Sequence, residues 1–382
     1  MSEIKVNSIK GVAASTAAIT VNNTNGTCAV NNTQRQGKNL VINGGMLCSQ
    51  RGTTFSQVAN TDITLDRFGL IHPYSTHFDV SQSTDSPDGF SKSYKLDINV
   101  VDSSIGTGQF VAIRHKIEAQ NLQQLAFGTS SAKSISLSFY VKSNKTGTFA
   151  VNIQQTDNSS KQVSAPFTIS SANTWERKTF TFAGDTSGVI NDDNGTGLTI
   201  LWWLSAGSTY NSGTSRSTFT AHADADSAVG CNVNILDSTD NNFFLTGVQL
   251  ETSDAASDFE YRSFGQELQL CKRYCQVLQS NTTGSPFTRF AVAIMQTTSS
   301  IRAIFNLSPE MRTIPSATKS GNFQIFPASG FSSGSFNIES GTSNFNTAIF
   351  LQSSGMSGTA GSAHYFSANG DADAKIIFDV EL

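Results

Sequence analysis

Residues 134–141 read Ser-Ile-Ser-Leu-Ser-Phe-Tyr-Val, and this alternation decides the fold class that we expect. Successive side chains of an extended strand point to opposite faces. Ile135, Leu137, Phe139 and Val141 therefore share one face, while small serines occupy most of the other face. The pattern predicts a β-strand with one buried side and one polar side.

Strand candidates of this kind recur through the middle of the chain, separated by turn pairs such as Asn-Gly, Asp-Gly and Ser-Gly. They are 65–72, 76–82, 91–100, 109–118, 133–142, 147–155, 162–169, 175–183, 197–205, 228–236 and 243–251. Many short strands with turn punctuation indicate a sandwich or jelly roll, and not a series of βαβ units. We therefore expect an all-β fold, with a jelly-roll sandwich over 39–262.

The composition fits a sheet protein with large polar surfaces. Only 14% of the 382 residues are charged, against roughly 25% in an average soluble domain. The 27 phenylalanines demand burial, so the chain does not read as disordered. A net charge of −4 gives no basic field for a polyanion, so we expect no nucleic-acid partner.

We expect no targeting signal at the start of the chain. Residues 1–5 read Met-Ser-Glu-Ile-Lys, which does not open a signal peptide. No apolar run reaches the roughly 18 residues of a membrane helix, so we expect no membrane insertion. Synthesis in a cytoplasm and release in a particle by lysis fit these features.

The cysteines form no recognisable framework, because their number is odd and none makes a Cys-x-x-Cys pair. They are Cys28, Cys48, Cys231, Cys271 and Cys275. We expect reduced, buried thiols.

Residues 1–38 stand apart as an N-terminal arm. The sequence Val-Asn-Asn-Thr occurs at 21–24 and again at 30–33, around an Asn-Gly pair that predicts a hairpin. A hairpin with so few large apolar residues is marginal alone. We therefore expect the arm to pack on copies of itself or on another protein. The positions that we assign to this attachment or trimerisation contact are Ile4, Val6, Ile9, Val21 and Val30.

One segment breaks the β pattern. From Phe264 to Gln279 the apolar residues fall at helical spacing, with Ser263 placed to cap and Glu267 in the first turn. We predict an amphipathic helix over 263–280, linking the jelly roll to a C-terminal β domain over 281–382. The strands expected in that domain are 287–295, 300–305 and 374–382.

Several motifs together resemble a known family. The most specific are 245–251 (Leu-Thr-Gly-Val-Gln-Leu-Glu), 258–263 (Asp-Phe-Glu-Tyr-Arg-Ser) and 267–274 (Glu-Leu-Gln-Leu-Cys-Lys-Arg-Tyr); the others are 39–46, 50–55, 64–68, 115–118, 136–142, 174–176 and 307–315. They resemble phage tail-fibre and virion structural proteins that carry a carbohydrate-binding-module-like jelly-roll domain. The resemblance covers roughly 39–315 and supplies no catalytic residues.

The resemblance implies a tail fibre or receptor-binding subunit on the virion of a tailed phage. Such a subunit is often a homotrimer, held to other virion proteins by its arm, and mediates host attachment by binding surface polysaccharide without chemistry. Two alternatives stay open: a capsid decoration or head-fibre protein with a purely architectural role, and a glycan depolymerase.

A search for catalytic or metal-binding patterns leaves only weak ones. Acidic residues gather in loop-like runs such as Asp224 with Asp226 and Asp371 with Asp373, without a spacing that indicates paired acid and base. No histidine pattern suggests a metal site. We expect no enzyme activity and no cofactor; a structural calcium ion is a minor alternative that no spacing supports.

Aromatic residues are the remaining candidates for ligand contact, because sugar rings stack on aromatic faces. Trp202 and Trp203 are adjacent on a predicted strand, so they point to opposite faces. One belongs to the core, and the other faces a second sheet, a neighbouring subunit or a ligand, with burial the commoner outcome. With Tyr210 and Asn211 from the following loop, they are our candidate glycan contacts.

Overall fold

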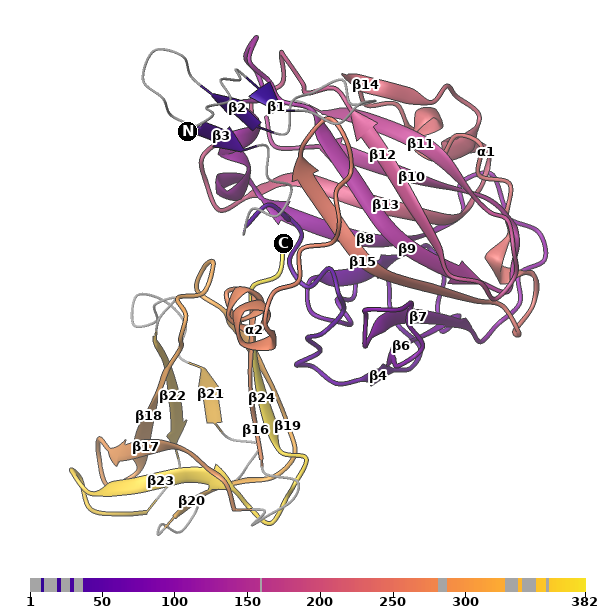
Figure 1. Ribbon diagram of the computed structural model, residues 1–382. Helices are drawn as coiled ribbons and strands as arrows, with labels where there is room; N and C mark the ends of the chain where they lie inside the picture. The colour runs from indigo at the N-terminus through magenta and orange to yellow at the C-terminus, as the bar shows by residue number, and fades with distance from the viewer. Residues whose placement is uncertain are drawn as a thin grey trace, which may run out of the picture.

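The computed structural model describes residues 37–158, 160–280, 287–326 and 357–382. Outside these ranges it describes only the backbone of short strands: β1 (Ser8–Ile9), β2 (Ile19–Val21), β3 (Cys28–Val30), β21 (Phe336–Ile338) and β22 (Ala348–Ser354). The regular secondary structure of the described chain is mostly antiparallel strand, arranged in a larger and a smaller part (Figure 1).

The larger part is a sandwich of two six-stranded sheets. The β9 sheet has the order β12 (Glu176–Phe182), β9 (Ile135–Ser143), β15 (Asn242–Thr252), β7 (Ser93–Ile98), β6 (Phe78–Ser83), β4 (Thr54–Phe55). The β13 sheet has the order β14 (Arg216–Ala221), β11 (Lys161–Ile169), β10 (Gly147–Gln155), β13 (Thr196–Ala206), β8 (Phe110–Glu118), β5 (Phe68–Ile71). The all-β sandwich expected from the sequence is confirmed.

The core of the sandwich follows from the alternation in β9. Ile135, Leu137, Phe139 and Val141 are all fully buried between the sheets. Phe139 meets the ring of Trp202 from the opposite sheet edge-on, with the centroids 5.8 Å apart. Such aromatic pairs add about 0.5–1.5 kcal/mol to the stabilisation from area burial alone.

The segment after β13 departs from the sequence prediction. Residues 228–236 form no strand; they are turns that lead into the short 3-10 helix η3 (Ile235–Asp237), and β14 was not predicted. Two apolar residues of this segment, Ala228 and Cys231, pack on the outer face of the β13 sheet, whereas Val233, Ile235 and Leu236 join the core between the sheets. The short elements η1 (Ala119–Leu125), α1 (Ser208–Asn211) and η2 (Asp224–Asp226) complete the connections.

The helix that follows the sandwich is shorter than predicted. α2 spans Phe264–Lys272 and begins with a capping box, in which Ser263 and Gln266 bond to each other's backbone N–H. The predicted helix over 263–280 is therefore wrong in its second half, which is strand β16 (Cys275–Gln279). The spacing of apolar residues there is compatible with a helix, but the segment forms a strand because it pairs with the distant strand β24 (Lys375–Asp379).

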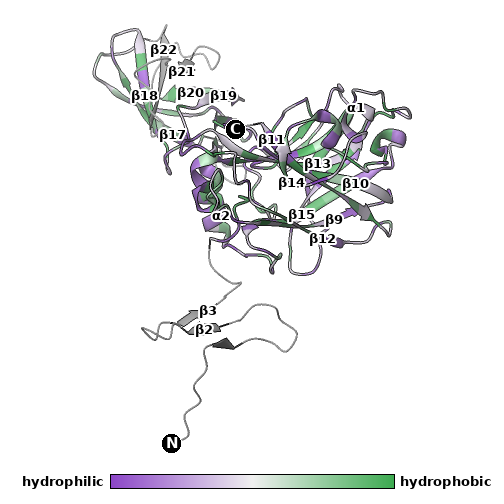
Figure 2. Cartoon of the chain, turned by 90° about the horizontal axis from the view of Figure 1, so that it is seen from above, coloured by the Kyte–Doolittle hydropathy of each residue, from purple (hydrophilic) through white to green (hydrophobic). Residues whose placement is uncertain are grey.

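The smaller part packs a three-stranded sheet against a six-stranded one. The first has the order β16, β24, β19 (Ser316–Ser320), and the second β20 (Phe323–Phe326), β23 (Ala363–Ala368), β17 (Arg289–Met295), β18 (Ser300–Asn306), β22, β21. Phe305, Phe366 and Phe378 lie buried between them. Strands expected at 287–295, 300–305 and 374–382 are confirmed with small shifts at their ends. Figure 2 shows α2 at the junction of the two parts, with hydrophilic and hydrophobic residues mixed along it.

The N-terminal arm contributes a small antiparallel sheet, β1-β2-β3. Val21 pairs with Cys28, so the hairpin predicted from the Asn-Gly signal is confirmed as a strand pairing. Ile9, Val21 and Val30 lie on these strands, whereas Ile4 and Val6 lie outside the described residues. The attachment role of all five stays a prediction.

Four cysteines can be placed: Cys48, Cys231, Cys271 and Cys275 are buried free thiols, as expected. In the described part of the chain, no helix combines the length and the apolar character that a membrane crossing requires.

Candidate ligand-binding site

The two adjacent tryptophans do point to opposite faces of β13, and both are buried. Trp202 is fully buried and lies between the sheets, near Phe68 and Phe139. Trp203 is 3% exposed, because Phe110 and Tyr210 cover it on the outer face of the β13 sheet. Neither indole offers a ring face to a sugar.

The loop residues of the same candidate set also serve the fold. The side-chain amide of Asn211 donates to the carbonyls of Ala206 (2.9 Å) and Cys231 (3.0 Å), which closes the loop over Trp203. The assignment of Trp202, Trp203, Tyr210 and Asn211 as glycan contacts is therefore corrected. The segment after β13 folds back over the sheet and buries the surface that they were expected to present.

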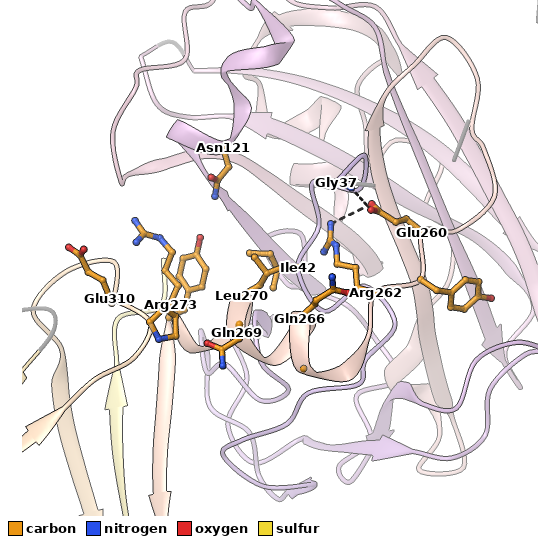
Figure 3. A pocket seen from close by; sticks show the side chains of 14 residues that line it. Gly37, Ile42, Asn121, Glu260, Arg262, Gln266, Gln269, Leu270, Arg273 and Glu310 are labelled. Atoms are coloured by element: carbon orange, nitrogen blue, oxygen red, sulfur yellow. Dashed lines mark hydrogen bonds and ion pairs between the residues drawn. The ribbon is translucent and has the colours of Figure 1, made fainter. Parts of the chain in front are cut away.

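A cavity of about 950 Å³ runs along α2, where the helix meets the sandwich and the smaller part (Figure 3). We call it the α2 groove. It is lined by Gly37, Ile42, Asn121, Glu260, Tyr261, Arg262, Gly265, Gln266, Gln269, Leu270, Arg273, Tyr274, Pro309 and Glu310. Figure 3 shows Asn121 facing the helix across the groove and Glu310 at its far end. Binding sites for small ligands typically measure about 300–1,000 Å³, so the groove is large enough for an oligosaccharide.

One wall of the groove is held by charged side chains at the start of α2 and just before it, which bind backbone groups. Glu260 accepts a hydrogen bond from the N–H of Asn39 at 2.7 Å. Arg262 donates to the carbonyl of Val41 at 3.1 Å. Glu267, in the first turn of α2, is 5% exposed and accepts from the N–H of Asn43. These charged side chains are therefore structural, and they fix the helix against residues 39–43.

The opposite wall is held by a buried carboxylate. Glu118 at the end of β8 accepts hydrogen bonds from Arg273 Nε (2.9 Å), Arg273 Nη2 (2.6 Å) and the Tyr274 hydroxyl (2.5 Å). Burial acts to raise the pKa of Glu118, but these donors outweigh it and hold that pKa below its usual range.

The open surface of the groove is mostly apolar, with uncharged amides along it. Ile42 and Leu270 supply aliphatic surface, and Leu270 is 38% exposed. Asn121 and Gln269 are exposed, and no described residue hydrogen-bonds to their side-chain amides. An amide both donates and accepts, so it can bind a sugar hydroxyl in either role.

A second cavity of about 320 Å³ adjoins the groove on the outer face of the β9 sheet. Three aromatic rings line this aromatic cleft: Phe90, Phe259 and Tyr261. Their centroids lie 5.0–5.5 Å apart in tilted or edge-on pairs. Tyr261 is 63% exposed, so part of its ring is open to solvent.

A glycine in β15 lets these rings approach the sheet. Gly247 has φ +60°, at a point where the register of β15 against β9 shifts. A Cβ there would lie 2.8 Å from the rings of Phe90 and Tyr140. Only glycine combines this backbone conformation with the close approach of two rings.

The groove and the cleft share two lining residues, Tyr261 and Arg262. A chain-like ligand can therefore extend from one cavity to the other past the exposed tyrosine. Sequence reasoning quoted 258–263 as a family motif but missed its aromatics as a site. Phe259 and Tyr261 are two residues apart in an extended segment, and that spacing is the signal that could have found them.

One carboxylate of each acidic loop pair is occupied by local contacts. Asp226 accepts from Arg216 Nε and the N–H of Thr214, and Asp371 accepts from the N–H groups of Asn322 and Asp373. Among the described residues, no group of three or more His, Cys, Asp or Glu side chains is placed to hold a metal ion.

Comparison with known proteins gives structural neighbours only. No family model matches the sequence, and no curated protein matches it. Solved structures that resemble it include the enzymatically active domain of tailspike protein 4 of bacteriophage CBA120 (14% identity, TM-score 0.28, 52% of this chain and 21% of that one). A family 16 carbohydrate-binding module (14%, TM-score 0.22, 45% and 84%) is another neighbour. A family 11 module of a Clostridium thermocellum cellulase (10%, TM-score 0.27, 53% and 97%) also resembles the chain. The match spans only about a fifth of the tailspike domain, and TM-scores this low support no conclusion about function.

Proposed function

We propose that this protein binds a host surface polysaccharide, without converting it, along the α2 groove and the aromatic cleft. The observation that carries the proposal is the exposed ring of Tyr261 between two adjoining cavities, one lined by aromatic rings and the other by amides and aliphatic groups. A sugar has apolar ring faces and hydroxyl groups around its edge. The aromatic rings complement the ring faces, and the amides complement the hydroxyls.

In the proposed complex, one sugar ring stacks against Tyr261. The adjacent sugars of the same chain contact the α2 groove. Asn121 and Gln269 hydrogen-bond to hydroxyls, each bond contributing about 0.5–1.5 kcal/mol. Such a site is weak by itself. Several copies on one particle raise the avidity by about 10²–10⁴ over a single site.

Binding without chemistry is supported by the state of the carboxylates. Glycoside hydrolysis uses two carboxyl groups on either side of the scissile bond, one as acid and the other as base or nucleophile. Three carboxylates line the two cavities. Glu260 and Glu267 accept hydrogen bonds from backbone N–H groups of 39–43, and Glu310 is exposed at the far end of the α2 groove. These contacts give Glu260 and Glu267 a structural role.

The particle context of the proposal comes from the sequence resemblance. The protein is proposed to be a tail-fibre or receptor-binding subunit of a tailed phage, joined to other virion proteins through residues 1–38 and assembled as a homotrimer. Light scattering of the purified chain is expected to give about three times the 40.8 kDa of one chain. Antibody-labelled microscopy of particles is expected to mark the tail; label on capsid faces would contradict the tail assignment.

The binding site is tested by titrating the whole chain with host polysaccharide. Tyr261→Ala is expected to weaken binding about tenfold, because stacking on an aromatic ring is worth about 1 kcal/mol or more. Tyr365→Ala, which removes another exposed tyrosine from β23, serves as the matched control. Equal affinities of the two variants would place the site elsewhere.

The absence of chemistry is tested separately by incubating the protein with the same polysaccharide. We expect no new reducing ends over prolonged incubation. Release of oligosaccharides would overturn the non-enzymatic proposal and favour a depolymerase.

A further inference from the structure

A row of polar side chains that line neither cavity crosses the outer face of the β13 sheet. Lys116 on β8 pairs with Thr199 on β13, which pairs with Gln154 on β10. The residues that alternate with them, among them Ile153 and Ile200, belong to the core, so this row faces outward. Side chains paired across strands have Cβ atoms about 4.5–5.5 Å apart, so an ammonium, a hydroxyl and an amide lie side by side.

A second cation lies on the same face of β8. Arg114 is two residues from Lys116, which places the two side chains about 7 Å apart along the strand. Both are half-buried. Arg114 donates to the carbonyl of Thr61 at a long 3.5 Å. No described carboxylate forms an ion pair with either side chain.

The carboxylates near these two cations already bind other side chains. Glu381 is held by Arg67 and Arg51. Glu118 is held by Arg273 and Tyr274. Arg114 and Lys116 therefore form a locally positive surface, although the net charge of the whole chain is −4.

A neighbouring guanidinium adds to this excess without neutralising it. Arg312 donates to the backbone carbonyls of Asn194 (3.0 Å) and Val380 (2.8 Å). Burial, followed by the positive charges of Arg114, Arg67 and Arg312, lowers the pKa of Lys116 to about 8. Like charges held together in this way destabilise the empty protein, and a bound anion relieves the repulsion.

We propose that this face is a second binding site, which takes an acidic glycan bearing carboxylate or sulfate groups. The anionic group lies between Arg114 and Lys116. Both side chains donate charge-assisted hydrogen bonds to it, which are stronger than hydrogen bonds between neutral groups. Gln154 is half-buried and binds a hydroxyl of the same or the next sugar, with the His222 ring 3.4 Å from its amide nitrogen, while Thr199, 6% exposed, lies beneath the ligand. This site is separate from Tyr261, and it adds a preference for charged glycans to the stacking site of the proposed function.

The test uses affinity electrophoresis of the whole chain in gels that contain alginate, dextran sulfate or neutral dextran. Retardation by alginate or dextran sulfate, and none by dextran, is expected. Comparing the first two tells whether carboxylate or sulfate is preferred. Lys116→Gln is expected to weaken retardation about tenfold, the value of one charge-assisted hydrogen bond.

Lys133→Gln is the matched control, because it removes one charge from an exposed lysine just before β9. Equal effects of Lys116→Gln and Lys133→Gln, or no retardation by either anionic polymer, would overturn the inference. Without ligand, Lys116→Gln is expected to melt no lower than the original protein, since it relieves repulsion. Tyr261→Ala is run in the same gels. If this variant loses retardation and Lys116→Gln does not, the second site is refuted and the site at Tyr261 is supported.

Discussion

Arg273 reaches Glu118 with two hydrogen bonds, at 2.9 and 2.6 Å, and so joins the segment after α2 to the last residue of β8. Tyr274 adds its hydroxyl to the same carboxylate, and Arg67 lies 3.5 Å above the tyrosine ring. The network couples the sandwich to the smaller part at the wall of the α2 groove. Its partners come from segments more than 150 residues apart in the sequence.

The Glu118→Gln variant is expected to lose about 3 kcal/mol of stability, because it leaves Arg273 beside a buried neutral group. The folded-state pKa of Glu118 is depressed below its ordinary 4.5. Its stabilisation is therefore complete above that value and is lost as the pH falls through the depressed pKa. Thermal melts at a series of pH values check both statements.

In those melts the original protein is expected to lose stability more steeply on acidification below about pH 5 than the variant does. Parallel curves for the two proteins would show that Glu118 is not the titrating group.

Gly247→Ala is expected to destabilise the sandwich by about 1–2 kcal/mol for the positive φ alone, and by more for the collision with Phe90 and Tyr140. Gly108→Ala is the control, since a Cβ at that position meets nothing within 4 Å. Chemical denaturation measures both. Similar midpoints for the two variants would contradict the role given to Gly247 in seating the aromatic cleft.

Trp202→Ala is expected to cost about 3–5 kcal/mol, because a fully buried indole leaves a cavity between the sheets. Trp175 is only partly buried, and its indole N–H donates to Asp85 at 3.1 Å. Its replacement by alanine is expected to cost clearly less. Denaturant unfolding of the two variants gives the comparison, and the reverse order would contradict the burial that separates them.

Thiol reactivity offers a test of the packing around the cysteines. Burial raises the pKa of Cys231 to about 12 and also raises the pKa values of Cys271 and Cys275. A thiol-specific reagent at neutral pH is therefore expected to label at most Cys28 in the folded protein and all five cysteines after unfolding. Rapid labelling of Cys231, located by mass spectrometry, would contradict its burial beside Trp203.

The local patterns predicted the strands well where they alternate with a period of two. The residues of β9 show why: each apolar side chain on one face has a place in the core, so the local pattern and the tertiary packing agree. The pattern failed at 228–236 and at 275–279. In both segments the contacts that fix the structure come from far away in the sequence: Ala228 and Cys231 pack on the outer face of the β13 sheet, and 275–279 pairs with β24.

The candidate site also shows that a local pattern cannot predict contacts with residues far away in the sequence. Trp202 and Trp203 were the obvious aromatics in the sequence, and the fold covers both of them. Tyr261 stood inside a motif, and its exposure depends on where α2 and residues 87–91 come to lie. Whether an aromatic ring is open or covered is a property of its neighbours in space, and local sequence carries little information about those neighbours.

The amino-acid sequence by itself determined the all-β class, the start of α2 at Ser263 and the opposite directions of the two tryptophans, because these follow from side-chain period and capping within a few residues. Only the tertiary structure decided that Glu118 binds Arg273, that two cavities meet at Tyr261, and that Arg114 and Lys116 face outward without a paired carboxylate among the described residues. Those relationships join strands and loops from distant parts of the chain, and their energies arise only when the sheets have packed.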